Sequence, residues 1–127
     1  MAYQFNKHYT RDEARALLPQ IRQWLQRLDE LRLELHARDR RLSALMEAGS
    51  DTGGELVNGW VRTVVETREV LSEFHCREIL VKDVERGLVD FPAIVGGREV
   101  FLCWEKDEDD IEFWHDLDTG YAGRERL

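Results

Sequence analysis

Apolar positions in the first third of the chain recur at steps of four and three residues. They are Leu17, Ile21, Trp24, Leu28, Leu31, Leu35, Leu42 and Leu45, and Arg38 interrupts the series. This spacing is typical of a coiled-coil seam and predicts a long helix. Thr10 followed by Glu13 is a capping-box sequence, so the helix should begin there. Pro19 removes a backbone donor, and we expect either a kink or a short first helix followed by a long one.

A second helix is predicted from about residue 55 to about residue 78, after a glycine-containing loop at residues 48–54. We expect one apolar stripe of this helix to face the first helix: Val57, Trp60 or Val61, Val64, Leu71 and Phe74. Because the loop is short, the two helices should lie antiparallel. Residues 10–78 are therefore predicted to form a helical hairpin.

Residues 79–116 have the pattern of a four-stranded antiparallel meander. Gly96-Gly97 predicts a two-residue turn, since both turn positions need positive φ. This turn pairs Val95 with Arg98, Pro92 with Phe101, and Asp90 with Cys103. A three-residue loop at Glu85-Arg86-Gly87 would pair Val84 with Leu88 and Lys82 with Asp90. The loop at residues 106–110 should be a solvated hairpin tip, and residues 117–127 are expected to be an irregular tail.

This register divides the meander into two faces, because successive side chains of a strand point to opposite sides. The face expected to meet the helices carries Ile79, Val81, Val89, Phe91, Ala93, Val95, Val100, Leu102, Trp104 and Trp114. The second face carries Lys82, Asp90, Cys103 and His115 among Leu80, Val84, Leu88, Phe101, Ile111 and Phe113. A slip of one residue in a hairpin would disperse the four polar side chains. The sequence thus predicts an α+β fold, organised as a single domain over residues 1–127.

Charge is distributed unevenly along the 127 residues, whose formal net charge is -8. Residues 1–50 hold nine Lys or Arg and seven Asp or Glu, whereas the remainder holds nine and nineteen. The acidic second part repels phosphate backbones, which argues against nucleic acid as a partner. The chain has no apolar run that could span a bilayer and no secretory leader, and its two cysteines make no disulfide framework. We therefore expect a cytoplasmic protein with no membrane partner.

Several short segments of the chain form a distinctive combination. They are Phe5-Asn6-Lys7-His8-Tyr9-Thr10, Glu13-Ala14, Leu17-Leu18-Pro19, Val81-Lys82-Asp83, Gly87-Leu88-Val89-Asp90-Phe91-Pro92-Ala93, Leu102-Cys103-Trp104, Trp114-His115 and Gly120-Tyr121-Ala122-Gly123-Arg124. Together they resemble a bacterial family catalogued as domain of unknown function 2203. The resemblance covers nearly the whole chain and implies no particular activity.

Asp90, Cys103 and His115 are residue types that bind zinc or another divalent transition metal. Three protein ligands and a water form the usual arrangement of a catalytic zinc site, so one interpretation is a metal-dependent, hydrolase-like enzyme. The ligands have no short-spaced pair, and the alternative is a buried cysteine and histidine that serve only packing. A third interpretation makes Cys103 a nucleophile, with His115 as its base and Asp90 as the orienting carboxylate.

The remaining interpretation is an interaction or small-ligand-binding domain that associates with itself. The apolar stripe of the first helix is wider than a narrow seam, because Leu18 and Leu25 flank it. One side of the hairpin is thus available to the sheet or to a second subunit. We expect a homo-oligomer, in its simplest form a homodimer, with the cluster of Lys82, Asp90, Cys103 and His115 at or beside the interface.

Overall fold

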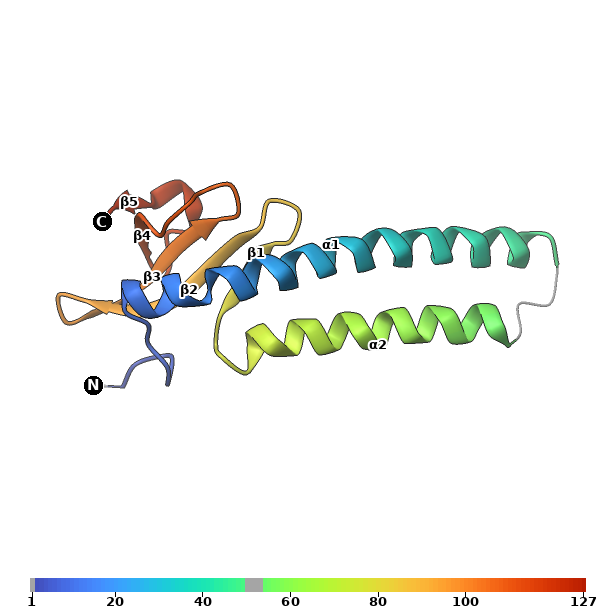
Figure 1. Cartoon of the computed structure of the whole chain (residues 1–127), viewed down its shortest axis with the longest axis horizontal. Helices are drawn as coiled ribbons and strands as arrows, with labels where there is room; N and C mark the ends of the chain where they lie inside the picture. The colour runs from blue at the N-terminus through green and yellow to red at the C-terminus, as the bar shows by residue number, and fades with distance from the viewer. Residues whose placement is uncertain (1, 50–53) are drawn as a thin grey trace.

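A long helical hairpin joins a small antiparallel sheet in the computed structural model, which describes residues 2–49 and 54–127. Helix α1 spans Arg11–Glu47 and helix α2 spans Glu55–His75. The two helices run side by side in opposite directions, and the first turns of α1 extend past the end of α2 to cross the sheet (Figure 1). The predicted hairpin followed by an antiparallel sheet is confirmed. Residues 50–53 of the predicted connecting loop lie outside the described residues.

The sheet has five strands in sequential order, one more than predicted. They are β1 (Leu80–Asp83), β2 (Leu88–Val95), β3 (Arg98–Glu105), β4 (Phe113–Asp116) and β5 (Glu125–Arg126). Strand β5 and a single 3₁₀ turn, η1 (Tyr121–Gly123), occupy the segment that was expected to be an irregular tail. Gly120 has a φ of 69° and turns the chain back so that β5 pairs with β4. Part of the predicted tail, β5, therefore forms one edge of the sheet.

Helix α1 begins with the predicted capping box. The Thr10 side chain accepts a hydrogen bond from the Glu13 amide, and the Glu13 carboxylate accepts one from the Thr10 amide. The helix then runs through Pro19 as one element, so the alternative of a short separate first helix is wrong. A kink at Pro19 stays a prediction.

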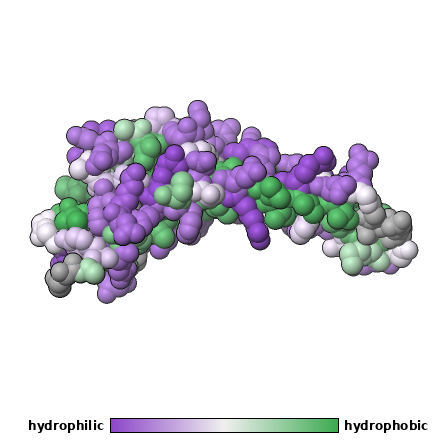
Figure 2. Space-filling view, turned by 90° about the horizontal axis from the view of Figure 1, so that it is seen from below, coloured by the Kyte–Doolittle hydropathy of each residue, from purple (hydrophilic) through white to green (hydrophobic). Residues whose placement is uncertain are grey.

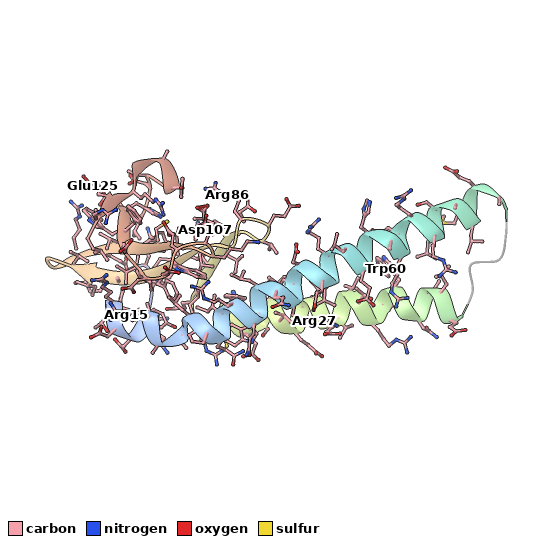
Figure 3. All side chains as sticks on the ribbon, turned by 45° about the horizontal axis from the view of Figure 1, so that its top comes forward. Arg15, Arg27, Trp60, Arg86, Asp107 and Glu125 are labelled. Atoms are coloured by element: carbon pink, nitrogen blue, oxygen red, sulfur yellow. The ribbon has the colours of Figure 1, made fainter. Side chains whose placement is uncertain are left out.

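Polar contacts join the two helices. Arg27 donates a hydrogen bond to Glu66 at 2.6 Å, and the Trp60 indole donates one to Asp39 (Figure 3).

The main hydrophobic core lies where α1 and the end of α2 cover the sheet. The buried residues of α1 are Ala14, Leu18, Ile21, Leu25, Leu28 and Leu31. Beyond Leu31 the seam continues through Leu35, Leu42 and Leu45, but these three are only half-buried. The predicted apolar spacing is thus correct, although only its first half meets enough partners to become a closed core.

Helix α2 presents a different face to α1 from the one predicted. Its buried residues are Gly59, Thr63 and Phe74, and of these only Phe74 belonged to the predicted stripe. Val57, Val61 and Leu71 are exposed instead, and Trp60 and Val64 are half-buried. At Gly59 the guanidinium of Arg38 on α1 lies against the α2 backbone, where a Cβ would collide with it. The Thr63 hydroxyl is compatible with burial because it donates to the Gly59 carbonyl at 3.0 Å.

The two faces of the sheet follow the predicted division with three exceptions. The core below the helices receives Ile79, Val89, Phe91, Ala93, Val100, Leu102 and Trp104, with Val81 and Trp114 packed against it. Val95 was wrongly assigned to this core, since it lies exposed at the tip of the β2–β3 hairpin. Val84 and Ile111 were assigned to the second face, but both contact the core. Val84 and Ile111 lie outside the regular strands, where the alternation of side chains between the two faces does not apply.

No helix in the described part of the chain is long and apolar enough to cross a membrane.

The segment before α1 is attached to the sheet through Glu99 on β3. The Glu99 carboxylate accepts hydrogen bonds from the amides of Gln4 and Phe5 and contacts His8 Nε2 at 2.7 Å. Burial of the carboxylate acts to raise its pKa, but these three contacts together hold the pKa of Glu99 below its ordinary value of 4.5.

We predict that Glu99→Gln lowers the free energy of unfolding at neutral pH by about 1–2 kcal/mol, because an amide replaces the charged acceptor. A carboxyl whose pKa is lowered by folding contributes its full stability above the pKa of the unfolded chain. That contribution is lost as the pH falls through the lower, folded-state pKa. Urea unfolding of both proteins from pH 7 to pH 3 should therefore show the difference shrinking in acid. A difference that stays constant over this range would contradict the prediction.

Candidate metal centre

Three polar side chains meet on the face of the sheet that points away from the helices. Gly96 and Gly97 have φ values of 60° and 77°, as the predicted two-residue turn requires. The resulting β2–β3 register places Asp90 opposite Cys103, and the β3–β4 register places Phe101 opposite His115. Because residues opposite one another share a face, Asp90, Cys103 and His115 project from adjacent strands to the same side. This predicted grouping is confirmed.

The three side chains are close enough to hold one metal ion. One potential ligand atom from each, taken from the Asp90 carboxylate, the Cys103 thiol and the His115 imidazole, lies within 4.8 Å of the other two. The residues are also enclosed, with exposed fractions of 2%, 0% and 2% for Asp90, Cys103 and His115. Buried ionisable groups are costly unless paired or coordinated. The arrangement is therefore more than a set of surface polar residues.

Hydrogen bonds fix the orientation of the His115 ring. Its Nδ1 lies 2.7 Å from the backbone carbonyl of Asp116, and its Nε2 lies 3.0 Å from Asp90 Oδ1. A carbonyl only accepts, so Nδ1 carries a proton and donates it. In a neutral imidazole, Nε2 then presents a lone pair toward the Asp90 carboxylate. The contact needs a positive group between the two atoms, either a proton or a metal ion.

Lys82 takes part less directly than predicted. The partner of Asp90 on β1 is Leu80, because the β1–β2 pairing shifts between Val81 and Asp83 and the connecting loop has four residues instead of three. Lys82 is exposed, and its Nζ lies 5.6 Å from the centre of the Phe101 ring. Burial raises the pKa of Asp90, while the charges of His115 and Lys82 act in the opposite direction without cancelling it. The predicted direct Lys82–Asp90 pair is wrong, but Lys82 still bears on the site electrostatically.

Arg124 is a neighbour of the site that the sequence did not reveal. It follows η1, its guanidinium pairs with Glu108 at 2.9 Å, and its charge acts to lower the pKa of the Cys103 thiol. The same guanidinium lies 3.9 Å from the Phe113 ring centre and 4.3 Å from that of Tyr121. The C-terminal segment thus covers the second face of the sheet near Cys103. The Gly120 turn was the one local signal, since this segment has no hydrophobic periodicity.

Burial also suppresses ionisation of the Cys103 thiol. It is the main reason that the pKa of Cys103 is raised to about 12, and the nearby Asp90 charge adds to the effect. Hydrogen bonding and charge from Arg124 oppose the shift but are outweighed. A thiol in this environment is protonated at neutral pH unless a metal ion displaces the proton.

Other residues of metal-binding types lie apart from this site. His75 and Cys76 are exposed at the end of α2. The acidic loop at residues 106–110 is solvated at Lys106, Asp107 and Asp109, as predicted, but it also contacts α1. Arg15 pairs with Asp110 at 2.8 Å, and Arg22 donates to the carbonyls of Lys106 and Glu108. The loop therefore attaches the sheet to α1.

Comparison with known proteins identifies a family. No curated protein and no solved structure matches the chain significantly. A family model with the description "Uncharacterized conserved protein (DUF2203)" matches residues 7–127. This range contains both helices, all five strands and the three clustered side chains. The chain belongs to the DUF2203 family, as the resemblance of its short segments implied.

Proposed function

We propose that the domain is a small-ligand-binding protein whose ligand is a divalent transition metal ion, with zinc as the best fit. The observation that carries the proposal is the convergence of Asp90, Cys103 and His115 within 4.8 Å on three adjacent strands. Zinc accepts sulfur, nitrogen and oxygen ligands together. A thiolate and an imidazole also favour zinc over magnesium or calcium, which prefer all-oxygen sites.

The hydrogen bond from His115 Nδ1 to the Asp116 carbonyl supports this assignment. Metal-ligating histidines usually donate their second ring N–H to a backbone carbonyl or a carboxylate, which fixes the tautomer and the ring direction. Here that bond leaves the Nε2 lone pair pointing at the Asp90 carboxylate, 3.0 Å away. An ion bound by both groups would take the place of the proton that they share.

Charge balance points in the same direction. An Asp90 carboxylate and a Cys103 thiolate carry two negative charges, which a divalent ion neutralises. The Cys103 proton must leave when the ion binds, and with a pKa of about 12 this release is costly at neutral pH. We therefore expect metal affinity to rise with pH.

The burial of the site favours metal binding over metal-dependent hydrolysis. A hydrolytic zinc site needs a coordination position that water and substrate can reach. The three side chains are almost completely enclosed, and Arg124 of the C-terminal segment lies over Phe113, the β4 partner of Cys103. The proposed role is accordingly to hold the ion, without a catalytic step.

We predict that purified, tag-free protein contains close to one zinc per chain, measured by inductively coupled plasma mass spectrometry after reconstitution and desalting. Asp90→Asn should lose this metal and still fold. The amide can donate a hydrogen bond to His115 Nε2, so the metal-free variant retains a satisfied pair that does not depend on a shared proton. Circular dichroism and thermal unfolding of the same samples would verify folding.

His75→Ala is the matched control, because His75 is an exposed histidine at the end of α2 and outside the cluster. This variant should keep the metal content of the wild type. The proposal is wrong if reconstituted wild type holds no zinc, iron or manganese, or if Asp90→Asn retains the wild-type amount.

The raised pKa of Cys103 generates a further prediction, which tests the alternative of a cysteine nucleophile. In chelator-treated protein near pH 7, Cys76 should react with a disulfide reagent such as DTNB much faster than Cys103. Cys76 is exposed, whereas Cys103 is buried and its pKa is about 12. The Cys76→Ser variant should therefore show almost no fast-reacting thiol. Rapid modification of Cys103 in this variant would instead favour the nucleophile.

A further inference from the structure

Helix α2 has two apolar faces, and the fold uses only one of them. The inner face packs on α1 and the sheet through Gly59, Thr63, Val70 and Phe74. The outer face carries Val57, Val61, Val64, Val65 and Leu71, and the exposed Arg68 lies among the last three. Four of the five apolar residues are exposed, with fractions of 36% for Val57, 44% for Val61, 48% for Val65 and 39% for Leu71. Viewed from the α2 side of the molecule, an apolar band runs along the hairpin (Figure 2).

The spacing of the outer face suits another helix. Val57, Val61 and Val65 are four residues apart and form a continuous ridge along α2. Ridges of this spacing interdigitate in the commonest class of helix pair. A surface helix normally has one apolar stripe, and a second contiguous stripe marks an interaction site. The 21 residues of α2 extend about 32 Å, which is long enough for a continuous helix–helix contact.

Charges beside this ridge are self-complementary in one orientation. Arg62 and Glu69 are seven residues apart, so they lie on the same flank of the outer face. Neither residue forms an ion pair with any other described part of the chain. If a second copy of α2 packs antiparallel with its twofold axis near Val65, each Arg62 meets Glu69 of the other copy. A parallel pair would place the two copies of this flank on opposite sides of the interface, so Arg62 and Glu69 would not meet.

The shape of the molecule agrees with the antiparallel orientation. The sheet lies at one end of the hairpin, beside the last turn of α2 (Figure 1). Antiparallel pairing of two copies places the two sheets at opposite ends of the assembly, where they cannot collide. Parallel pairing would put both sheets at the same end.

We infer that the outer face of α2 is a homodimer interface, at which the α2 helices of two copies pack antiparallel and each α1 lies on the far side of its own α2. The contact is isologous, since the same five apolar residues serve both copies. It uses none of the side chains of the metal centre, so the interface and the metal site can be tested independently.

Sedimentation-velocity ultracentrifugation of the full chain tests the interface. The mass derived from the sedimentation of wild-type protein should be twice the chain mass of 15.0 kDa. The double variant Val61→Glu, Val65→Glu should sediment as a monomer with an unchanged circular dichroism spectrum, because both positions are exposed. The control is Leu33→Glu, an exposed leucine of α1 outside the α2 outer face, which should remain dimeric. Monomeric wild type, or a dimer that persists in the double variant, would overturn the inference.

Charge exchange tests the orientation. Arg62→Glu and Glu69→Arg should each weaken the dimer, since each places like charges against one another twice. The combination of both changes should restore the wild-type dissociation constant to within a few-fold. If the combined variant dissociates as readily as either single variant, the antiparallel interface is wrong.

Discussion

The register of the β2–β3 hairpin determines both faces of the sheet. Its turn contains two residues, and both adopt the positive φ that glycine tolerates best. One additional residue in the turn would reverse the faces of β3 relative to β2. Leu102 and Trp104 would then leave the core, and Cys103 would face the helices. Since β4 pairs with β3, the same register also sets the position of His115. The apolar core and the candidate metal centre thus lie on opposite faces of the sheet, and both depend on this one turn.

This dependence explains which parts of the site were predictable from the sequence. A Gly-Gly pair between two apolar runs specifies the length of the turn, so the pairing of Asp90 with Cys103 could be derived. The β1–β2 connection contains one glycine, Gly87, at a φ of 65°, which is compatible with loops of several lengths. The actual loop and the irregularity between Val81 and Asp83 moved Lys82 from its predicted position. Strand β5 has two residues, too few for any periodic signal.

Helix α2 shows a second limit of what a hydrophobic pattern can predict. Two faces of this helix can bury residues, one with small side chains and one with valines. A search for apolar stripes selects the valines, because it gives no weight to glycine or threonine. Packing, however, depends on shape as well as hydrophobicity, and the absence of a side chain at Gly59 leaves room for Arg38 of α1 against the α2 backbone. The predicted stripe was a genuine feature of the sequence, but its direction could not be read from hydrophobicity alone.

The exposed valines also lie in the part of the hairpin that has the least internal support. Burial on α1 ends at Leu31, and its later leucines are only half-buried. In an antiparallel hairpin, that second half of α1 lies beside the first half of α2, where Val57 and Val61 face solvent. Helices gain most of their stability from tertiary packing of an apolar face, and ion pairs on exposed surfaces add little. A second copy over α2 would supply apolar contacts where the single chain lacks them. The same sequence feature that misdirected the helix prediction is therefore a physical argument for self-association.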